Sequence, residues 1–301
     1  MTFTEDSRVK IPTILHLTRM GYQYLSKKDI VWDEETNIIT QIFKDSISKI
    51  NDQIDADDCD RIFNEINNSL GDEDLGEGFF NKLISTSGTK LIDFENFENN
   101  SFHVVTELTC KNGDDEFRPD ITLFINGMPL VFIEVKKPNN REGVLAERER
   151  IKVRSRNKKF RKFINITQLM IFSNNMEYND DSPEPIEGAF YASSSYENPI
   201  FNYFREEDKS LDQQLHAEDE EIENFVLKDN NLEAIKSTPE FITNKSSNTS
   251  SNRLCTSLLS KERISFLLQY GLVYVNEKGD KQKHVMRYPQ MFATRSIKAT
   301  L

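Results

Sequence analysis

The dipeptide Asn126-Gly127, set between two apolar runs, constrains the fold more than any other feature of this sequence. The runs cover residues 121–125 (ITLFI) and 130–135 (LVFIEV), and both are rich in β-branched and aromatic side chains. Asn-Gly is a strong signal for a tight turn between antiparallel strands, because both residues tolerate positive φ. The sequence therefore predicts a buried β-hairpin near its centre.

Patterns on either side of this hairpin predict a mixed α/β fold. Apolar residues recur with helical spacing through residues 1–85, which predicts about three amphipathic helices. Further strands are expected at 102–108 and 167–173, a polar loop at 111–116, and a long basic helix at 142–163. We therefore expect a mixed central sheet flanked by helices.

Composition divides the chain into two parts. Residues 1–250 are expected to form one domain, helical over 1–85, with an α/β core at 100–205. The segment 246–252 (SSNTSSN) is a low-complexity linker candidate, so we place a domain boundary near residue 250. Residues 251–301 then form the linker and the beginning of a further domain.

Charge, cysteine usage and hydropathy exclude several classes of protein. The net charge of −12 argues against a protein that coats nucleic acid with its whole surface. No apolar run is long enough for a membrane span, and no secretory signal is present, so a cytoplasmic protein is expected. Cys59, Cys110 and Cys255 lack the spacing of a disulfide framework or a zinc site.

Three polar residues at one end of the hairpin form a candidate site. Asp120 precedes the first strand, and Glu134 and Lys136 share a face of the second because they are two residues apart. A two-residue loop, 126–127, would pair position 120 with 133 and turn Asp120 away unless a bulge or bend intervened. A three-residue loop, 125–127, pairs 120 with 132 and brings the three side chains together, so we expect the three-residue loop.

Two converging carboxylates repel each other unless a cation is present. Mg²⁺ suits Asp120 and Glu134, with the backbone carbonyl of Val135 as a further ligand and waters completing the octahedron. A lysine beside that ion can orient or deprotonate water and can stabilise charge on a phosphoryl group. The pattern is typical of a phosphodiesterase, although a surface hairpin with ordinary edge charges accounts for the spacing equally well.

The residues around this site resemble the PD-(D/E)xK nuclease core of the restriction (R) subunits of type I restriction-modification enzymes. The matching blocks are 118–121 (RPDI), 126–130 (NGMPL), 133–138 (IEVKKP) and 160–178 (FRKFINITQLMIFSNNMEY). The resemblance implies a restriction-endonuclease-like core in which Asp120 and Glu134 bind Mg²⁺ and Lys136 is the catalytic lysine.

The same resemblance implies the enzyme class and its partners. It implies a type I site-specific deoxyribonuclease that cuts double-stranded DNA and acts with methyltransferase (M) and specificity (S) subunits. Many family members also carry a glutamate on the first helix and a Gln-x-x-x-Tyr helix after the second strand. Glu5 is a candidate for the former, whereas the expected helix over 146–154 has arginines in place of the glutamine and tyrosine.

Residues 287–290 (RYPQ) resemble the glutamine motif that precedes the motor domains of these subunits. The resemblance implies that Gln290 contacts the adenine of ATP in the full-length subunit, and that 251–301 hold the truncated start of the first helicase-like motor domain. An exposed helical glutamine is the alternative. No GxxxxGK[ST] motif occurs, so we expect no ATPase activity from this fragment.

Positive charge is concentrated next to the candidate site. Residues 136–162 hold twelve bases and three acids, a net charge of +9, which leaves −21 on the remainder. A basic helix leaving a metal site is where a DNA backbone would bind, although a solvated helix is the alternative. The candidate DNA-binding residues are Arg148, Arg150, Arg154, Arg156, Lys158 and Lys159. A non-catalytic module that clamps DNA or docks subunits remains the rival to a nuclease.

Overall fold

A mixed sheet of seven strands forms the centre of the molecule. The computed structural model describes residues 4–52, 54–138, 143–178, 187–197, 199–208, 215–277 and 280–300. The strand order is β1-β2-β5-β6-β7-β8-β9, in which β6 and β7 are parallel and β2, β5 and β6 are antiparallel. The strands are β1 (Gln23–Tyr24), β2 (Phe102–Thr106), β5 (Ile121–Ile125), β6 (Met128–Val135), β7 (Leu169–Ser173), β8 (Ala189–Ala192) and β9 (Asn202–Tyr203).

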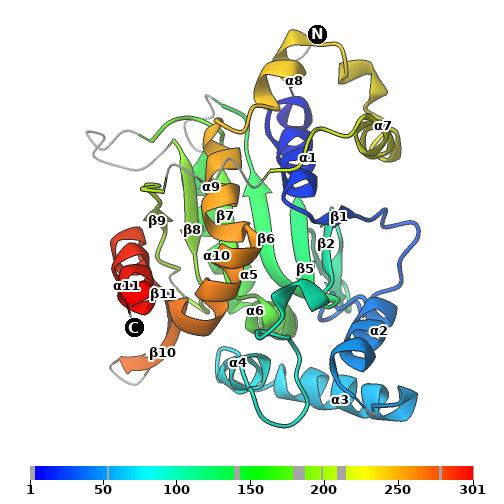
Figure 1. Ribbon diagram of the computed structural model, residues 1–301, viewed down its shortest axis with the longest axis vertical. Coiled ribbons are helices and arrows are strands. Elements are labelled where there is room, and N and C mark those ends of the chain that lie inside the picture. The colour runs from blue at the N-terminus through cyan, green and yellow to red at the C-terminus, as the bar shows by residue number, and fades with distance from the viewer. Residues whose placement is uncertain are drawn as a thin grey trace.

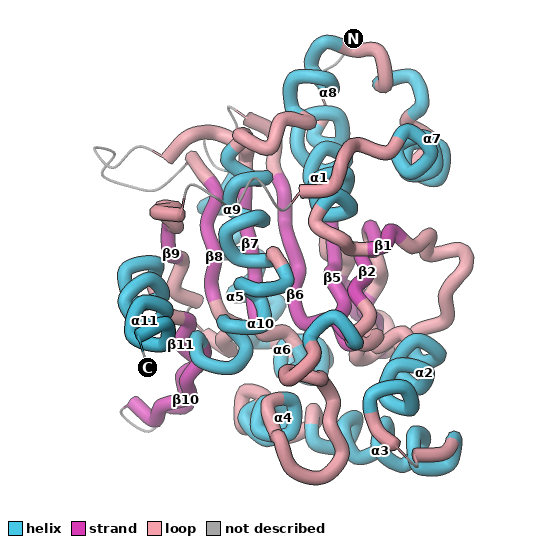
Figure 2. Tube along the Cα trace, in the orientation of Figure 1, coloured by secondary structure: helices cyan, strands magenta, loops and turns pink. Residues whose placement is uncertain are grey.

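Helices cover both faces of this sheet, which confirms the mixed α/β expectation. Figures 1 and 2 show α9 and α10 in front of the sheet, α5 and α6 behind it, and α2, α3 and α4 gathered at one end. The helices are α1 (Ile11–Arg19), α2 (Thr40–Ile50), α3 (Ala56–Ser69), α4 (Glu77–Leu83), α5 (Gly143–Arg156), α6 (Arg161–Ile166), α7 (Glu220–Asp229), α8 (Pro239–Asn244), α9 (Ser250–Leu259), α10 (Lys261–Phe266) and α11 (Tyr288–Thr300).

Alternate residues of the central hairpin serve two separate cores. Val131, Ile133 and Val135 pack with α1, α9 and α10 on one face. Phe132, between them in sequence, packs on the other face against Phe163 of α6, with ring centroids 5.8 Å apart. Because β6 is buried on both sides, its sequence is a nearly continuous apolar run.

The turn of the hairpin differs from the one we predicted. Ile125 pairs with Met128, so the loop has two residues, and the predicted three-residue loop is wrong. Asn126 and Gly127 have φ of 51° and 75°, the positive values that a type I′ turn requires. A bulge at Leu130 then shifts the register, so that Ile121 pairs with Ile133. Continuing this register places position 120 opposite 134.

Neighbouring segments hold this turn in place. The buried Asn126 side chain accepts a hydrogen bond from the Ser101 amide and donates to the Leu91 carbonyl and to Asn100 Oδ1. A Cβ on Gly127 would lie 2.6 Å from the backbone nitrogen of Phe43 in α2. Positive φ and this close contact both require glycine there.

Three further expectations need adjustment. The helix expected at 142–163 ends at Arg156, and a short 3₁₀ turn, Lys158–Phe160, separates it from α6; position 142 lies outside the described residues. The expected polar loop at 111–116 is instead part of a hairpin of β3 (Cys110–Asn112) and β4 (Asp115–Phe117). The first eighty-five residues hold a fourth helix, α4, besides the three expected.

The C-terminal part packs on the same sheet. Ser250, Ser251 and Asn252, expected to belong to a linker, are buried in the first turn of α9. The hydroxyl of Ser251 lies 2.7 Å from that of Ser173 at the end of β7. A hairpin of β10 (Leu272–Glu277) and β11 (Asp280–Val285) follows. The domain boundary near residue 250 stays a prediction. Among the described residues, no helix has both the length and the apolar character needed to cross a bilayer.

Candidate active site

The structure brings Asp120, Glu134 and Lys136 together at one end of the central hairpin. Oδ2 of Asp120 accepts a hydrogen bond of 2.8 Å from the backbone amide of Val135, which fixes the start of β5 against the end of β6. Nζ of Lys136 lies 3.9 Å from the same oxygen. The bulge at Leu130 therefore achieves what we had expected from the turn.

Glu134 is the most deeply placed acid of this group, at 4% exposure. Its Oε1 atom is buried and has no hydrogen-bond partner among the described residues, while Nη1 of Arg154 lies 3.6 Å away. Burial, and then repulsion from Asp120 and Glu147, raise the pKa of Glu134 well above its ordinary value. An unsatisfied buried carboxylate oxygen is costly unless a cation or donor reaches it.

Lys136 lies among acids from three parts of the chain. Its Nζ donates to the Val135 carbonyl at 2.8 Å, and carboxylate oxygens of Glu147 and Glu5 lie 3.5 Å and 4.0 Å away. Burial lowers the pKa of Lys136, but the surrounding carboxylates of Asp120, Glu147, Glu5 and Glu134 outweigh it and hold the pKa above its ordinary value. Lys136 is therefore an ammonium at neutral pH.

Glu5, the candidate for the family's glutamate on the first helix, reaches the site from the N-terminal end of the first helical segment. It precedes η1 (Asp6–Lys10), a π-helical turn that continues into α1. Burial, opposed by attraction to Lys136, raises the pKa of Glu5. Turns of this kind inside helices are frequent at functional sites, because they re-aim side chains.

Helix α5 contributes two residues that sequence reasoning did not assign to the centre of the site. Glu147 is 2% exposed, and its carboxylate contacts Lys136, Arg150 and Arg154. Arg154 lies 3.2 Å from Glu147 and stacks over the Phe117 ring at 4.2 Å. Positions 147, 151 and 154 share one helical face, which could have revealed them, because that face holds buried Ile151.

The six candidate DNA-binding residues differ in their surroundings. Arg150 and Arg154 pair with Glu147, Arg148 with Glu149, Lys158 with Glu73, and Lys159 with Asp115. Arg156 alone of the six has no carboxylate partner among the described residues. Because carboxylates pair with most of these cations, the surface of α5 is less positive than its sequence implied. Its DNA-binding role stays a prediction.

The donor atoms at the site suit a hard divalent ion. Asp120 and Glu134 supply carboxylates, and the Val135 carbonyl directly follows Glu134 in the chain. Within the described residues, no three acidic, histidine or cysteine side chains form a metal cage. Mg²⁺ needs no such cage, since it usually takes one or two carboxylates and keeps several waters. Oε1 of Glu134, which has no hydrogen-bond partner among the described residues, fits a cation ligand.

Gln290 lies far along the chain, in the first turn of α11. Its Oε1 accepts a hydrogen bond of 2.8 Å from the backbone amide of Arg287, which precedes that helix. This contact satisfies one of the free amides at the helix N-terminus. The nucleotide-binding role of Gln290 stays a prediction.

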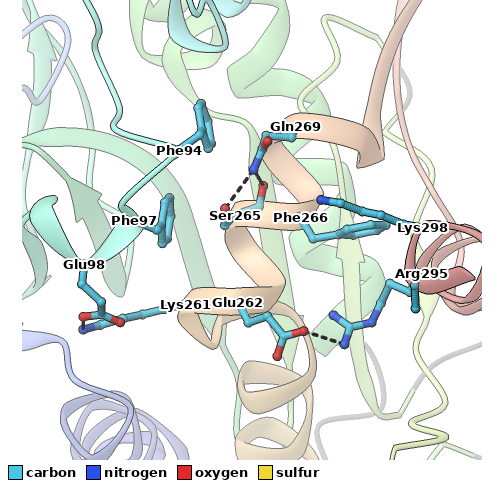
Figure 3. Close-up of a pocket in the computed structure, with 11 residues that line it drawn as sticks. Phe94, Phe97, Glu98, Lys261, Glu262, Ser265, Phe266, Gln269, Arg295 and Lys298 are labelled. Carbon is cyan, nitrogen blue, oxygen red and sulfur yellow. Dashed lines mark hydrogen bonds and ion pairs between the residues drawn. The ribbon is translucent and has the colours of Figure 1, made fainter. Parts of the chain in front are cut away.

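A cavity of about 650 Å³ lies away from the catalytic cluster. Figure 3 shows Phe94 and Phe97 on one side of it and Arg295 and Lys298 of α11 on the other. Glu262 of α10 pairs with Arg295 across its floor, at 2.6 Å. None of the residues predicted to be catalytic lines this cavity.

Comparison with known proteins gives consistent matches. The putative type I restriction enzyme MjaVIIIP endonuclease subunit of Methanocaldococcus jannaschii is 33% identical over 113 residues, which cover 33% of this chain and 11% of that protein. The MjaVIIP endonuclease subunit of the same organism is 51% identical over 47 residues, or 16% of this chain and 4% of that protein. The type I restriction enzyme HindI endonuclease subunit of Haemophilus influenzae is 27% identical over 150 residues, or 42% and 14%.

The matched parts are thus a small share of these relatives' length. A family model for the N terminus of type I restriction enzyme R proteins matches residues 2–180, more than half of this chain. The match includes Asp120, Glu134, Lys136 and the whole of α5. The chain therefore belongs to the type I restriction enzyme R protein family, to whose N-terminal part it corresponds.

Proposed function

We propose that this chain is the nuclease part of a type I restriction R subunit and that it hydrolyses phosphodiester bonds in double-stranded DNA with Mg²⁺. The observation that carries this proposal is the buried oxygen of Glu134, which has no hydrogen-bond partner among the described residues, beside Asp120 and Lys136. Asp120, Glu134 and the Val135 carbonyl would hold the ion, which when bound activates water and polarises the phosphate.

The chain's own residues divide the remaining work. Lys136 is kept charged by its acidic neighbours, so it suits stabilisation of the negative charge on the phosphate better than proton abstraction. Glu147 holds both Lys136 and Arg154 in position from α5. The amide of Val135 orients Asp120, so that its second oxygen remains available.

The proposal extends to the partners of the subunit. We propose that it acts in the cytoplasm with methyltransferase and specificity subunits, and that ATP-driven translocation resides in parts of the subunit downstream of this chain. The names of the relatives, which describe endonuclease subunits of type I restriction enzymes, support only the restriction-system part of this proposal.

Plasmid cleavage by the subunit assembled with its partners tests the catalytic assignment. With Mg²⁺ present, Asp120→Ala and Lys136→Ala should each abolish cutting, whereas Lys228→Ala on the exposed face of α7 should cut like wild type. Continued cutting by both site variants would contradict the assignment. A wild-type assembly that binds and translocates DNA without cutting it would favour the DNA-clamping alternative.

A further inference from the structure

A second cavity, of about 570 Å³, lies beside the end of α5. Its walls come from α5 and α6, from the loop after β8, and from the β10–β11 hairpin near the C-terminus. The residues that matter for its chemistry are Arg156, Lys158, Arg161, Tyr196, Lys281 and Gln282. The β10–β11 hairpin therefore forms one wall of a cavity whose other walls come from the nuclease core.

The cavity has a positive balance of charge. Four cations line it, against the two acids Glu73 and Glu197. Glu73 is exposed and is shared by Lys158 and Arg161, at 3.2 Å and 2.7 Å. Lys281 pairs with Glu77, whereas Arg156 has no carboxylate partner within the described part of the chain.

The lining side chains are hydrogen-bond donors of the kinds that contact phosphates. Arginine, lysine, serine, asparagine, glutamine and tyrosine supply most protein contacts to the DNA backbone, and the cavity contains every one of them. Asn276 and Gln282 come from the hairpin, and Ser155 comes from α5. Such a set favours the sugar-phosphate backbone over an apolar ligand.

The cavity lies a short distance from the catalytic cluster along one rigid element. Glu147, which contacts Lys136, and Arg156, which lines the cavity, are nine residues apart in α5. At 1.5 Å per residue this spans roughly 13 Å. Nine residues also turn the helix through about two and a half turns, so Arg156 and Glu147 project from opposite sides of α5.

The hairpin is fixed firmly enough to hold its side of the cavity. Lys283, next to Gln282, is buried and donates to the Thr167 carbonyl and the Ser194 hydroxyl at 3.0 Å and 2.8 Å. The hydroxyl of Tyr274 in β10 donates to the Leu75 carbonyl. The position of Lys281 and Gln282 is therefore set before any ligand binds.

We propose that this cavity binds phosphates of the DNA duplex flanking the cutting point, and that the β10–β11 hairpin is part of the DNA site. The proposal rests on the proposed nuclease function, since it takes the Asp120, Glu134 and Lys136 cluster as the cutting point. DNA is favoured over an acidic protein segment because α5 contributes residues both to that cluster and to the cavity.

Metal-free DNA binding tests the proposal separately from cleavage. The chain is titrated, in the presence of EDTA, against a fluorescein-labelled duplex of arbitrary sequence, over a series of NaCl concentrations. Arg156→Gln should weaken binding several-fold and reduce the slope of log affinity against log salt by about one, as loss of one phosphate contact requires. Gln282→Glu should weaken binding by placing a negative charge in the cavity without removing a side chain.

Two controls match these changes. Lys228→Gln removes one exposed positive charge on α7, and Gln23→Glu adds one negative charge at exposed β1; both should bind like wild type. Thermal unfolding of each variant checks that the fold is intact. Equal affinity and salt slope in the cavity variants and the controls would overturn the proposal. That result would favour an acidic protein segment as the occupant of the cavity. Cleavage that survives Asp120→Ala would instead overturn the nuclease function and leave these binding results standing.

Discussion

The half-buried Lys136 and the buried Lys283 have opposite surroundings. Lys136 lies among the carboxylates of Asp120, Glu147, Glu5 and Glu134, which raise its pKa in spite of burial. Lys283 in β11 is 4% exposed, and its contacts are the neutral oxygens of residues 167, 168 and 194. Burial lowers the pKa of Lys283 to about 7, against its ordinary value of 10.5.

The difference separates a lysine suited to stabilising negative charge on a ligand from a structural one. A cluster of acids around a buried amine keeps a positive charge at a point where a phosphate can approach. Neutral acceptors around a buried amine satisfy its hydrogen bonds but stabilise its charge less than carboxylates do. The opposite directions of the two pKa shifts therefore follow from the charge of the groups around each amine.

The largest expected effect is a difference between the two lysines: substitution of Lys136 should impair cleavage, whereas substitution of Lys283 should impair stability. Lys136→Gln should reduce plasmid cleavage by about 10²–10³-fold, the cost of losing one preorganised group that stabilises charge. Lys283→Gln should instead act mainly on stability, because it loses contacts that join the hairpin to β7 and β8. Cleavage and chemical denaturation are measured in parallel. If Lys283→Gln impaired cleavage as much as Lys136→Gln did, the comparison would fail.

Removal of the acid that pairs with Lys136 should come next in size. Glu147→Ala leaves Arg154 and Lys136 without their shared buried partner, so the free energy of unfolding should fall by about 3 kcal/mol. Urea denaturation measures this change. Glu149→Ala, on the exposed face of the same helix, is the matched control and should leave stability almost unchanged. Equal effects of the two substitutions would mean that the buried network contributes little.

The lowered pKa of Lys283 predicts a dependence of stability on pH. Between about pH 7 and pH 10.5 the unfolded chain binds a proton that the folded chain does not, so the free energy of unfolding should rise with pH across this window. Lys283→Met lacks the titrating group and should lose this contribution. Urea denaturation of both proteins at about pH 7 and about pH 9 measures the difference in slope. Parallel slopes would show that the buried amine does not titrate in this range.

The smallest expected effect concerns Arg154. Arg154→Lys keeps the charge near Glu134 but loses the planar group that stacks on Phe117, which should reduce stability by about 1 kcal/mol. Arg150→Lys, more exposed on the same helix, is the matched control. Thermal unfolding of the two variants isolates the stacking on Phe117: similar shifts in both would show that this stacking adds nothing to stability.

The central hairpin shows how far sequence could predict this fold. Alternating apolar residues and Asn126-Gly127 were enough to predict both strands. The requirement that the polar side chains share one face predicted that Asp120 lies near Glu134. The predicted turn was wrong, because a two-residue turn with a bulge at Leu130 and a three-residue turn without a bulge place the same side chains on each face of the hairpin. The side-chain pattern reports which residues share a face, whereas the position of the extra residue depends on packing against α2.

The rest of the site was missed because its signals are not local. Glu147 looked like one acid in a basic helix, and only the fold shows that it is buried against Lys136. Nothing in the local sequence marks Lys283, although its buried amine donates to the Thr167 carbonyl ahead of β7 and to the Ser194 hydroxyl after β8. Residues 250–252 looked like a linker by composition, yet they are buried in α9. In each case long-range packing overrode a local pattern.

The anchored turn at Asn126 also has a consequence for the order of folding. The strands that it joins are adjacent in the chain, and hairpins of this kind close in microseconds. The groups that lock the turn, at Leu91, Asn100 and Ser101, lie roughly 25 to 35 residues upstream and must arrive through a larger loop. We therefore expect the central hairpin to form early but to acquire its final rigidity late, when that segment reaches it.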